Sequence, residues 1–461
     1  MFIWTANWSR RSTSIRTKTR TKAARRCSTR SSSRTRATRC AWRCAASLIP
    51  DRRARKLALP QPLSSARAQE RRAPARLLIR GARQLVTLRG STSPRRGAQA
   101  GELAIIPDGA VLIEGETIAE VGPGRRVMNL EAARKAEEFD AAGRVVMPGF
   151  VDGHTHLVSG PQGNAVGAIP GGRLAHSARK LAATAVRHGT TTLEAKTGCG
   201  ADARGELKSL RALRDLKGFP LDIFPTLLAG RCVPSEWSGK PGEYLEWFAW
   251  ELLPKVHRRG LARFVDVDHS AGFSEAEVER FYHSALALGF DIRLHGGGAV
   301  LALRLGARSV DVSRPEEALA LAGSDIVATL LPMEAFFRGD PPSGAARKLV
   351  EAGVPVAIAS GFDRAGCASL SMPAAVALAC RLFGMRPAEA IAAATVNAAH
   401  ALGVAWAIGS IECRKLADLI VLDVSDYRDV ASALGVNPVL AVIKRGRVVY
   451  KRSPVEGSED E

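Results

Sequence analysis

The stretch that decides the fold is Val145-Val-Met-Pro-Gly-Phe-Val-Asp-Gly-His154-Thr-His156, an apolar run that ends in two histidines separated by one residue. Side chains on a strand alternate between its two faces, so His154 and His156 point to the same side and can reach one metal ion. Pro148 and Gly149 break the run just before the pair, as expected where a buried strand opens into a loop at the mouth of a barrel. The stretch therefore predicts half of a metal site.

The middle of the chain, residues 145–404, alternates short apolar runs with segments of helical length. Eight strands are predicted, near Val145, Thr190, Leu221, Arg263, Asp291, Ser309, Ile326 and Val354. Residues 275–289 are typical of the helices between them, because Ser274 is a favourable N-cap and Gly289 a favourable stop. This alternation predicts an α/β fold, a (β/α)8 barrel of the TIM type.

The segments on either side of the barrel return to strand patterning. Residues 76–144 hold short apolar runs around turns, as at 77–88 and 109–122, and residues 405–461 do so at 417–423 and 439–450. With 461 residues, 46% of them hydrophobic, the chain is long enough for two or three domains. We expect both ends to form a small β-sandwich domain beside the barrel.

The net charge of +21 belongs to the first 72 residues, which carry 20 Lys and Arg against 2 Asp and Glu, leaving 46 against 43 for the rest. Their Ser, Thr and Arg cannot bury enough apolar surface to offset the entropy of ordering, so residues 1–75 are predicted to be a disordered basic tail. An organelle transit peptide, a nucleic-acid-binding arm and an anionic-membrane patch all fit such a tail. A further interpretation is that the tail is not native protein, because the folded pattern begins only near Leu77.

The eight cysteines show neither CxxC nor zinc-ribbon spacing. We therefore expect reduced thiols and a cytoplasmic protein, with an organelle as the alternative if the tail is a transit peptide. No apolar stretch reaches transmembrane length without a charge or a breaker, which argues against a membrane span.

A third histidine, His295, ends the predicted fifth strand and is followed by three glycines, which let backbone approach an ion or ligand closely. Because barrel strands end at a common rim, His295 is expected beside His154 and His156. Three neutral imidazoles would hold one divalent ion, zinc by preference and iron as the alternative, with a position open for water. Such an ion lowers the pKa of a bound water and polarises a carbonyl.

A set of short motifs extends over about residues 77–452. They are Pro148-Gly-Phe-Val-Asp-Gly-His-Thr-His-Leu-Val, Gly189-Thr-Thr-Thr-Leu-Glu-Ala-Lys-Thr-Gly, Phe264-Val-Asp-Val, Leu330-Leu-Pro, Ser371-Met-Pro, Ala393-Ala-Thr-Val-Asn-Ala-Ala-His-Ala-Leu-Gly, Ala417-Asp-Leu-Ile-Val-Leu-Asp and Gly435-Val-Asn-Pro. Together they resemble the amidohydrolase superfamily and, within it, the imidazolonepropionase family.

The resemblance implies a metal bound by the two histidines of the first motif, a histidine after strand five and an aspartate after strand eight. The first three correspond to His154, His156 and His295, but Gly361 stands where the aspartate is expected. An arginine expected soon after the first motif is also missing. The remaining departures are Cys199 for a tyrosine, Arg231 and Val312 for histidines, and His295-Gly-Gly-Gly for His-Ala-Asp-Glu.

Asp363 offers a replacement for the missing aspartate. It lies two residues past Gly361, so on an extended strand it faces the same way, about 6 to 7 Å nearer the mouth. With no side chain at Gly361 to obstruct it, we expect Asp363 to bend back, directly or through a water, as metal ligand or base. The alternative is a solvated loop carboxylate paired with Arg364.

Arg231, Lys196 and Cys199 are the residues predicted to bind substrate. Arg231 either holds a substrate carboxylate with its guanidinium fork or is a surface charge. Lys196 either points into the pocket from the second strand or belongs to a structural ion pair. His269, at the end of the fourth strand, is not expected to be a ligand.

The resemblance implies a metal-dependent hydrolase of the C–N bond in a small cyclic amide, converting imidazolone propanoate to N-formimidoyl-glutamate in histidine degradation. His295 at the ion and a carboxylate that shuttles the proton to the leaving nitrogen, for which Asp363 is the candidate, would be catalytic. The departures keep two alternatives open, another lactam or amide substrate and a metal-binding pseudoenzyme. A homodimer is the default expectation for a soluble oligomer, and nucleic acid is not an expected partner outside the tail.

Overall fold

A computed structural model describes residues 75–453, apart from residues 91, 161–165, 201, 217, 297 and 313–314. The predicted tail lies outside the described residues except for Ala75, as do Cys27, Cys40 and Cys44. All the described residues belong to one compact unit.

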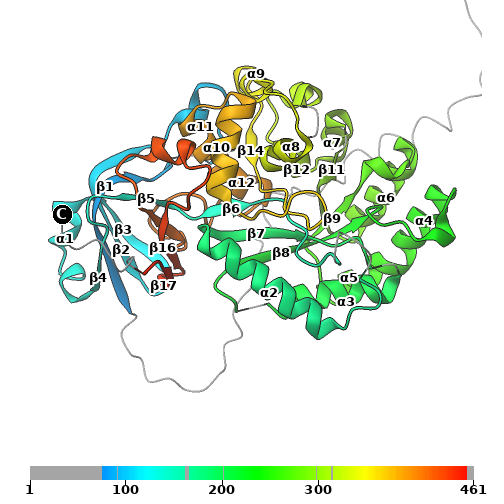
Figure 1. The fold of residues 1–461 in the computed structure, drawn as a ribbon, viewed down its shortest axis with the longest axis horizontal. Coiled ribbons are helices and arrows are strands. Elements are labelled where there is room, and N and C mark those ends of the chain that lie inside the picture. Colours follow the sequence, from blue (N-terminus) through cyan, green and yellow to red (C-terminus); the bar gives the residue numbers. More distant parts are fainter. Residues whose placement is uncertain are drawn as a thin grey trace, which may run out of the picture. The chain divides into compact units, whose positions relative to one another are not determined.

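Both ends of the chain contribute to one mixed sheet (Figure 1). Its strands follow the order β17-β16-β15-β5-β1-β2-β3, with β4 beside β1. They are β1 (Arg76–Val86), β2 (Ile105–Glu114), β3 (Thr117–Pro123), β4 (Glu137–Asp140), β5 (Val145–Pro148), β15 (Leu419–Leu422), β16 (Val439–Lys444) and β17 (Arg447–Lys451). Strand β5 joins the two halves, because Val145 pairs with Gln84 of β1 and Pro148 with Leu419 of β15. Both ends of the chain thus form one continuous hydrogen-bonded sheet, while the sandwich packing predicted from the sequence stays a prediction.

The core of this sheet domain draws on both ends of the chain. Buried side chains of β1, β2, β5, β15 and β16 gather in one cluster, which includes Ile79, Val111, Val146, Leu419 and Ile443. A second cluster, with Leu78 and Leu112, lies against the short helix α1 (Gly124–Met128). Each such side chain contributes about 1.5 to 3 kcal/mol on burial, so neither end is expected to fold alone.

The middle of the chain forms two parallel sheets whose strands follow chain order. The first holds β6 (Phe150–Asp152), β7 (Thr190–Lys196), β8 (Asp222–Ala229), β9 (Phe264–Val267) and β10 (Asp291–Ile292). The second holds β11 (Leu294–His295), β12 (Ser309–Asp311), β13 (Val327–Leu330) and β14 (Val356–Ile358). Bridges between Asp268 and His295 and between Thr155 and Phe362 connect the sheets at both edges. The strands therefore close into a ring, with β10 and β11 as successive parts of the fifth strand.

The predicted first strand divides at Gly149. Residues 145–148 belong to β5 of the mixed sheet, and the barrel begins only with Phe150. Glycine suits this junction, because a Cβ on Gly149 would lie 2.3 Å from the side chain of Thr191 in β7. The prediction that the barrel begins at Val145 was thus early by one short strand.

Helices connect most of the barrel strands (Figure 1). They are α2 (Gly171–Arg187), α3 (Ala203–Arg214), α4 (Pro241–Trp247), α5 (Leu253–Arg258), α6 (Glu275–Ala287), α7 (Ala299–Leu305), α8 (Pro332–Arg338), α9 (Ala345–Glu351), α10 (Met372–Phe383), α11 (Pro387–Ala393) and α12 (Val396–Ala401). Segments of 3-10 helix, or of π-helix in the case of η6, are η2 (Gly97–Gly101), η3 (Ala133–Lys135), η5 (Ser235–Trp237), η6 (Phe248–Leu252), η7 (His269–Ala271), η8 (Pro315–Leu321) and η9 (Tyr427–Ser432).

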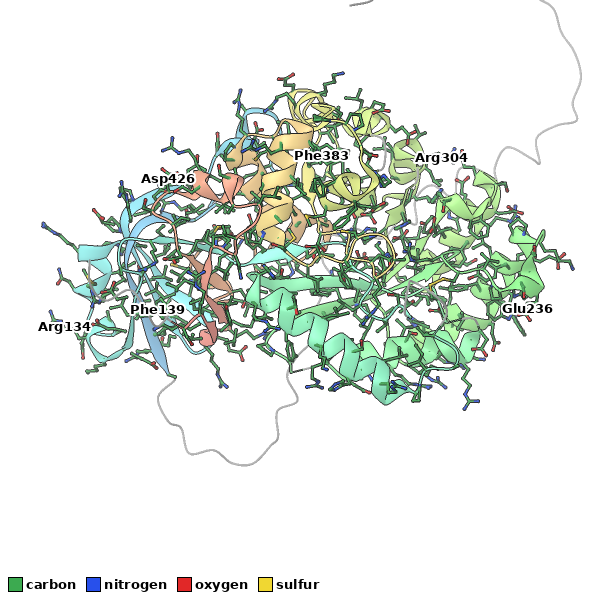
Figure 2. The ribbon with its side chains drawn as sticks, viewed as in Figure 1. Arg134, Phe139, Glu236, Arg304, Phe383 and Asp426 are labelled. Atoms are coloured by element: carbon green, nitrogen blue, oxygen red, sulfur yellow. A yellow bond between two sulfur atoms is a disulfide. The ribbon has the colours of Figure 1, made fainter. Side chains whose placement is uncertain are left out.

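Helix α6 begins as predicted, with a capping box in which Ser274 and Glu277 satisfy each other's backbone N–H groups. Arg304 of α7 pairs with Glu275 and Glu279 of α6 on the molecular surface (Figure 2). Within the described residues, we find no helix with the length and hydropathy that crossing a bilayer requires.

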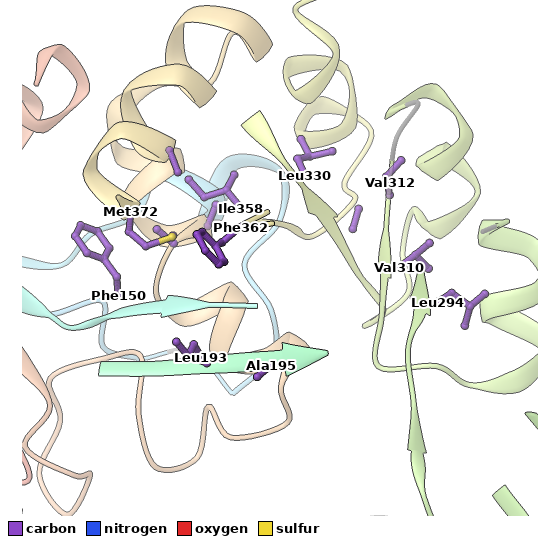
Figure 3. Close-up of a cluster of buried hydrophobic side chains, with 14 of the residues drawn as sticks. Phe150, Leu193, Ala195, Leu294, Val310, Val312, Leu330, Ile358, Phe362 and Met372 are labelled. Atoms are coloured by element: carbon purple, nitrogen blue, oxygen red, sulfur yellow. The ribbon is translucent and has the colours of Figure 1, made fainter. Parts of the chain in front are cut away.

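Strand alternation sorts the barrel residues into two sets. Figure 3 shows the apolar set, in which Leu193 of β7, Leu294 of β11 and Val310 of β12 belong to one buried cluster with Phe150 and Ile358. Neighbours along a strand point to opposite faces. The polar residues that alternate with this set therefore lie together on the other face, and they are Glu194, Lys196, Arg293, His295 and Asp311.

Candidate metal centre

The three predicted histidines meet at the carboxyl ends of the barrel strands. His154 and His156 follow β6, and His295 ends β11. Their ring centroids are 5.2 Å apart for His154 and His156, 4.9 Å for His154 and His295, and 6.1 Å for His156 and His295. Because metal–nitrogen bonds are about 2 Å long, rings at these separations can share one ion. The meeting of imidazoles from two separated stretches is confirmed.

Burial keeps two of these imidazoles in the neutral form that metals bind. It lowers the pKa of His154 to about 3 and that of His156 well below its ordinary value. For His295 burial acts in the same direction, but Asp311, Asp266 and Asp268 raise the pKa above its ordinary value.

His156 supplies a direct test of whether these residues fit a metal ion. Its Nε2 is buried, and among the described residues it has no hydrogen-bond partner. A buried polar nitrogen without a partner costs about 1 to 3 kcal/mol, which a bound ion would offset. The donor set therefore fits a divalent transition ion.

Asp311, at the end of β12, joins the histidines although the sequence analysis did not select it. One ligand atom each from His154, His295 and Asp311 lie within 4.8 Å of one another. Asp311 Oδ2 is 2.9 Å from His154 Nδ1 and 3.7 Å from His295 Nδ1. Burial would raise the pKa of Asp311, but Lys196 and His154 lower it well below its ordinary value, so the carboxylate is ionised. The signal that would have found it is its place at the end of the predicted sixth strand.

Lys196 lies inside the barrel in a network of buried charges. Its Nζ is 2.6 Å from Asp266, 3.1 Å from Asp311 and 3.2 Å from Glu194. Arg293 completes the network, 3.1 Å from Glu194 and 3.3 Å from Asp311. Burial would lower the pKa of Lys196, but these carboxylates raise it, so the lysine is charged. Of its two interpretations, the structural ion pair is the one these contacts support.

Asp363 faces Arg231 across the rim. Its carboxylate pairs with the Arg231 guanidinium, and its Oδ1 accepts a hydrogen bond from the backbone of Ala365. Arg364, the partner expected in the alternative, instead donates to Ser177. The register argument for Asp363 fails because β14 ends at Ile358 and Gly361, at φ +66°, is not extended.

Gly361 opens toward helix α8. A Cβ there would lie 3.5 Å from the Cβ atoms of Leu331 and Glu334. These two residues, with Val312, help to line a cavity of about 170 Å³. The positions of two family departures, Val312 and Gly361, thus border the same part of the rim.

The expectation that all thiols are reduced is wrong for two cysteines. Cys199, in the loop after β7, forms a disulfide with Cys232, in the loop after β8, across a Cα–Cα distance of 4.9 Å. Neighbouring parallel strands bring these loops together at one rim, which a separation of 33 residues in sequence does not reveal. The disulfide places Cys199 beside Arg231, the residue that precedes Cys232.

His269 lies in η7, just past β9. Burial lowers its pKa to about 4. In the described part of the chain, the group of metal-ligating atoms that lie within 4.8 Å of one another consists of His154, His295 and Asp311, and includes none of His156, His269 and Asp363.

Comparison with known proteins gives concordant matches. The profile of the amidohydrolase family matches residues 145–282 and 338–449. The imidazolonepropionase of Symbiobacterium thermophilum is 37% identical over 422 residues, which cover 83% of this chain and 99% of the relative. That of Chloroflexus aggregans is 38% identical over 423 residues, covering 82% and 99%.

Solved structures show the same fold at lower identity. Guanine deaminase of E. coli has a TM-score of 0.62 at 16% identity, over 82% of this chain and 100% of that one. An adenosine deaminase from Xanthomonas campestris with bound zinc has a TM-score of 0.60 at 19% identity, over 84% and 95%.

Proposed function

Since this chain belongs to the amidohydrolase family, we infer that it is an imidazolonepropionase-like hydrolase that cleaves a C–N bond in a small cyclic amide. The observation that carries this inference is the meeting of His154, His156 and His295 at one rim. The identity to imidazolonepropionases, which extends over 99% of two relatives, supports it. The substrate we propose is imidazolone propanoate and the product N-formimidoyl-glutamate.

We propose that His154, His156 and His295 hold one zinc ion. Neutral imidazoles are preferred zinc ligands, and a relative in fold, the adenosine deaminase from Xanthomonas campestris, carries zinc. When bound, such an ion supplies Lewis-acid chemistry, polarising a carbonyl and lowering the pKa of a water. His156, whose Nε2 is buried and has no other described partner, is the ligand whose loss should be felt most directly.

Arg231 and Asp363 are the proposed substrate-facing pair. They lie at the rim, where the Arg231 side chain is 23% exposed and that of Asp363 11%, whereas Lys196 is fully buried among its carboxylates. In this proposal Arg231 donates to the substrate, and Asp363 carries a proton toward the leaving nitrogen once substrate separates the two side chains. Cys199 then acts on substrate binding only through the disulfide that holds the Arg231 loop.

The test of the function is metal content measured together with turnover. The full chain should contain about one zinc per chain, and the absorbance of imidazolone propanoate should fall when that protein is added. His156→Ala should lose both, while its fold, checked by circular dichroism, persists. Stoichiometric zinc without turnover on a panel of cyclic amides would instead support the pseudoenzyme that Gly361 suggests, and no zinc would contradict the proposal.

The role of Asp363 has its own test. Asp363→Asn should lower kcat by about 10² to 10⁴, the usual contribution of a positioned proton carrier. Asp325→Asn is the matched control, because Asp325 forms an exposed pair with Arg96. Full metal-dependent activity of Asp363→Asn would exclude Asp363 as ligand or base.

We also propose a homodimer located in the cytoplasm. Light scattering tests the first, with twice the monomer mass as the expected result. The mature N-terminus, read by mass spectrometry, tests whether the basic tail redirects the protein to an organelle.

A further inference from the structure

Asp311 has three side-chain partners besides His295. Oδ2 lies 2.9 Å from His154 Nδ1 and 3.1 Å from Lys196 Nζ, and Oδ1 lies 3.3 Å from the Arg293 guanidinium. The side chain is 3% exposed, so these partners take the place of solvent. Both of its oxygens therefore already contact donor groups. This arrangement suits a carboxylate that orients its neighbours by accepting hydrogen bonds better than one that binds the metal ion itself.

The partner that matters for the ion is His154. A neutral imidazole carries one N–H and one lone pair, and the hydrogen bond at one nitrogen decides which nitrogen binds metal. A proton on Nδ1 that is donated to Asp311 leaves the lone pair on Nε2. The same Asp311 oxygen lies 3.7 Å from Nδ1 of His295, which is beyond hydrogen-bond distance, so its hydrogen bond to an imidazole is the one with His154.

We propose that Asp311 is the positioning residue of the metal site: it fixes the tautomer of His154 and is itself held by Lys196 and Arg293. The inference rests on the proposed metal site but adds a residue that the family's ligand pattern, as read from the sequence, does not contain. It also gives the buried network a function, because Lys196 and Arg293 hold the carboxylate in place.

The experiment compares two isosteric variants of the full chain. Asp311→Asn should weaken zinc binding by about 10 to 100-fold, measured by competition with a chromophoric chelator. Asp266→Asn is the matched control: Asp266 is equally buried and binds the same lysine, but its other side-chain partner is Tyr282 rather than an imidazole. Its zinc affinity should fall much less than that of Asp311→Asn, because Asp266 acts on His295 only through its charge. The visible spectrum of bound cobalt should change only in Asp311→Asn.

The outcomes distinguish failure of the positioning role of Asp311 from failure of the proposed function. Unchanged zinc affinity in Asp311→Asn, or equal weakening in both variants, would overturn the positioning role while the proposed function stands. Failure of the wild-type chain to bind zinc would overturn the function and the inference together.

A measurement on the wild-type chain covers the case in which Asp311→Asn does not fold. Long-range 15N–1H correlation of the zinc-bound protein, labelled at histidine, reports which ring nitrogen of His154 is protonated. A proton on Nδ1 supports the inference, and a proton on Nε2 overturns it.

Discussion

Lys196 and Lys444 are two buried lysines at opposite ends of the barrel strands. Lys196 lies at the carboxyl end of β7, with its Nζ 2.6 Å from Asp266. Lys444 of β16 lies 2.6 Å from Asp418 and 2.7 Å from Asp222, the first residue of β8. At both lysines burial lowers the pKa and the neighbouring carboxylates raise it above its ordinary value.

The two networks differ in what their carboxylates contact next. Asp311, a partner of Lys196, continues to His154, whereas Asp222 and Asp418, the partners of Lys444, also accept hydrogen bonds from Arg445. A buried ion pair is therefore not in itself a sign of a functional site. In barrels of this type the carboxyl ends of the strands carry the chemistry and the opposite ends contribute stability, and the two lysines follow that division.

The largest effects should come from removing each lysine in turn. Lys444→Met leaves two buried carboxylates without their cation and should lower the free energy of unfolding by about 3 to 5 kcal/mol, with zinc affinity unchanged. Lys196→Met should lower the free energy of unfolding by a similar amount. It should also weaken zinc binding, because Asp311 loses the ion pair that holds it in place. Urea denaturation and chelator competition on both variants measure the two quantities. Equal zinc affinity in the two variants would contradict the view that only the Lys196 network supports the metal site.

A smaller effect is expected from the disulfide at the rim. Cys232→Ser should lower the free energy of unfolding by about 2 to 4 kcal/mol, because the cross-link restrains the unfolded chain. Dithiothreitol should lower the wild-type denaturation midpoint in the same way and leave that of Cys232→Ser unchanged. Cys413→Ser, at an exposed free thiol, is the control. A wild-type midpoint that is indifferent to reductant would contradict this prediction.

The same disulfide allows the rim and the buried metal site to be distinguished by enzyme kinetics. Since it flanks Arg231 rather than the histidines, Cys232→Ser should raise KM more than it changes zinc affinity. Loss of zinc from Cys232→Ser with an unchanged KM would contradict this prediction, because it would mean that the disulfide supports the metal site and not the Arg231 loop.

The sequence predicted the parts of this molecule that depend on local pattern. His154, His156 and His295 were found because each ends an apolar run, and strand ends in a barrel meet at one rim. The start of α6 was found for the same local reason, since Ser274 is a favourable N-cap.

What the sequence did not predict depends on contacts between distant segments. Asp311 ends a strand of only three residues, and its place beside the histidines appears only once β12 pairs with β11. The side of the strand to which the Asp363 side chain points was not predicted correctly, because the backbone is not extended there: Gly361 has φ +66°. Cys199 and Cys232 are paired by the adjacency of two loops, and their spacing carries no signal of that.

The smallest effect on stability should come from an ion pair between a cation and a carboxylate that is partly exposed to solvent. Arg144 lies 2.7 Å from Asp423, and both side chains are about one-third exposed. Because solvent screens such a pair, Arg144→Gln should lower the free energy of unfolding by only about 0.2 to 1 kcal/mol, against the several kcal/mol expected for Lys444→Met.

Its pH dependence has a definite sign. The hydrogen bond with Arg144 lowers the pKa of Asp423, and the ion pair with Arg452 lowers it further, so the folded state holds this carboxylate ionised to lower pH than the unfolded state does. The contribution is therefore complete above the unfolded pKa of about 3.9 and is lost as the pH falls through the lower folded value. Urea midpoints of wild type and Arg144→Gln should differ at pH 7 and converge toward pH 3. A difference that persists in acid would mean that Arg144 stabilises the sheet by packing, and that exposure alone does not separate this pair from the buried lysines.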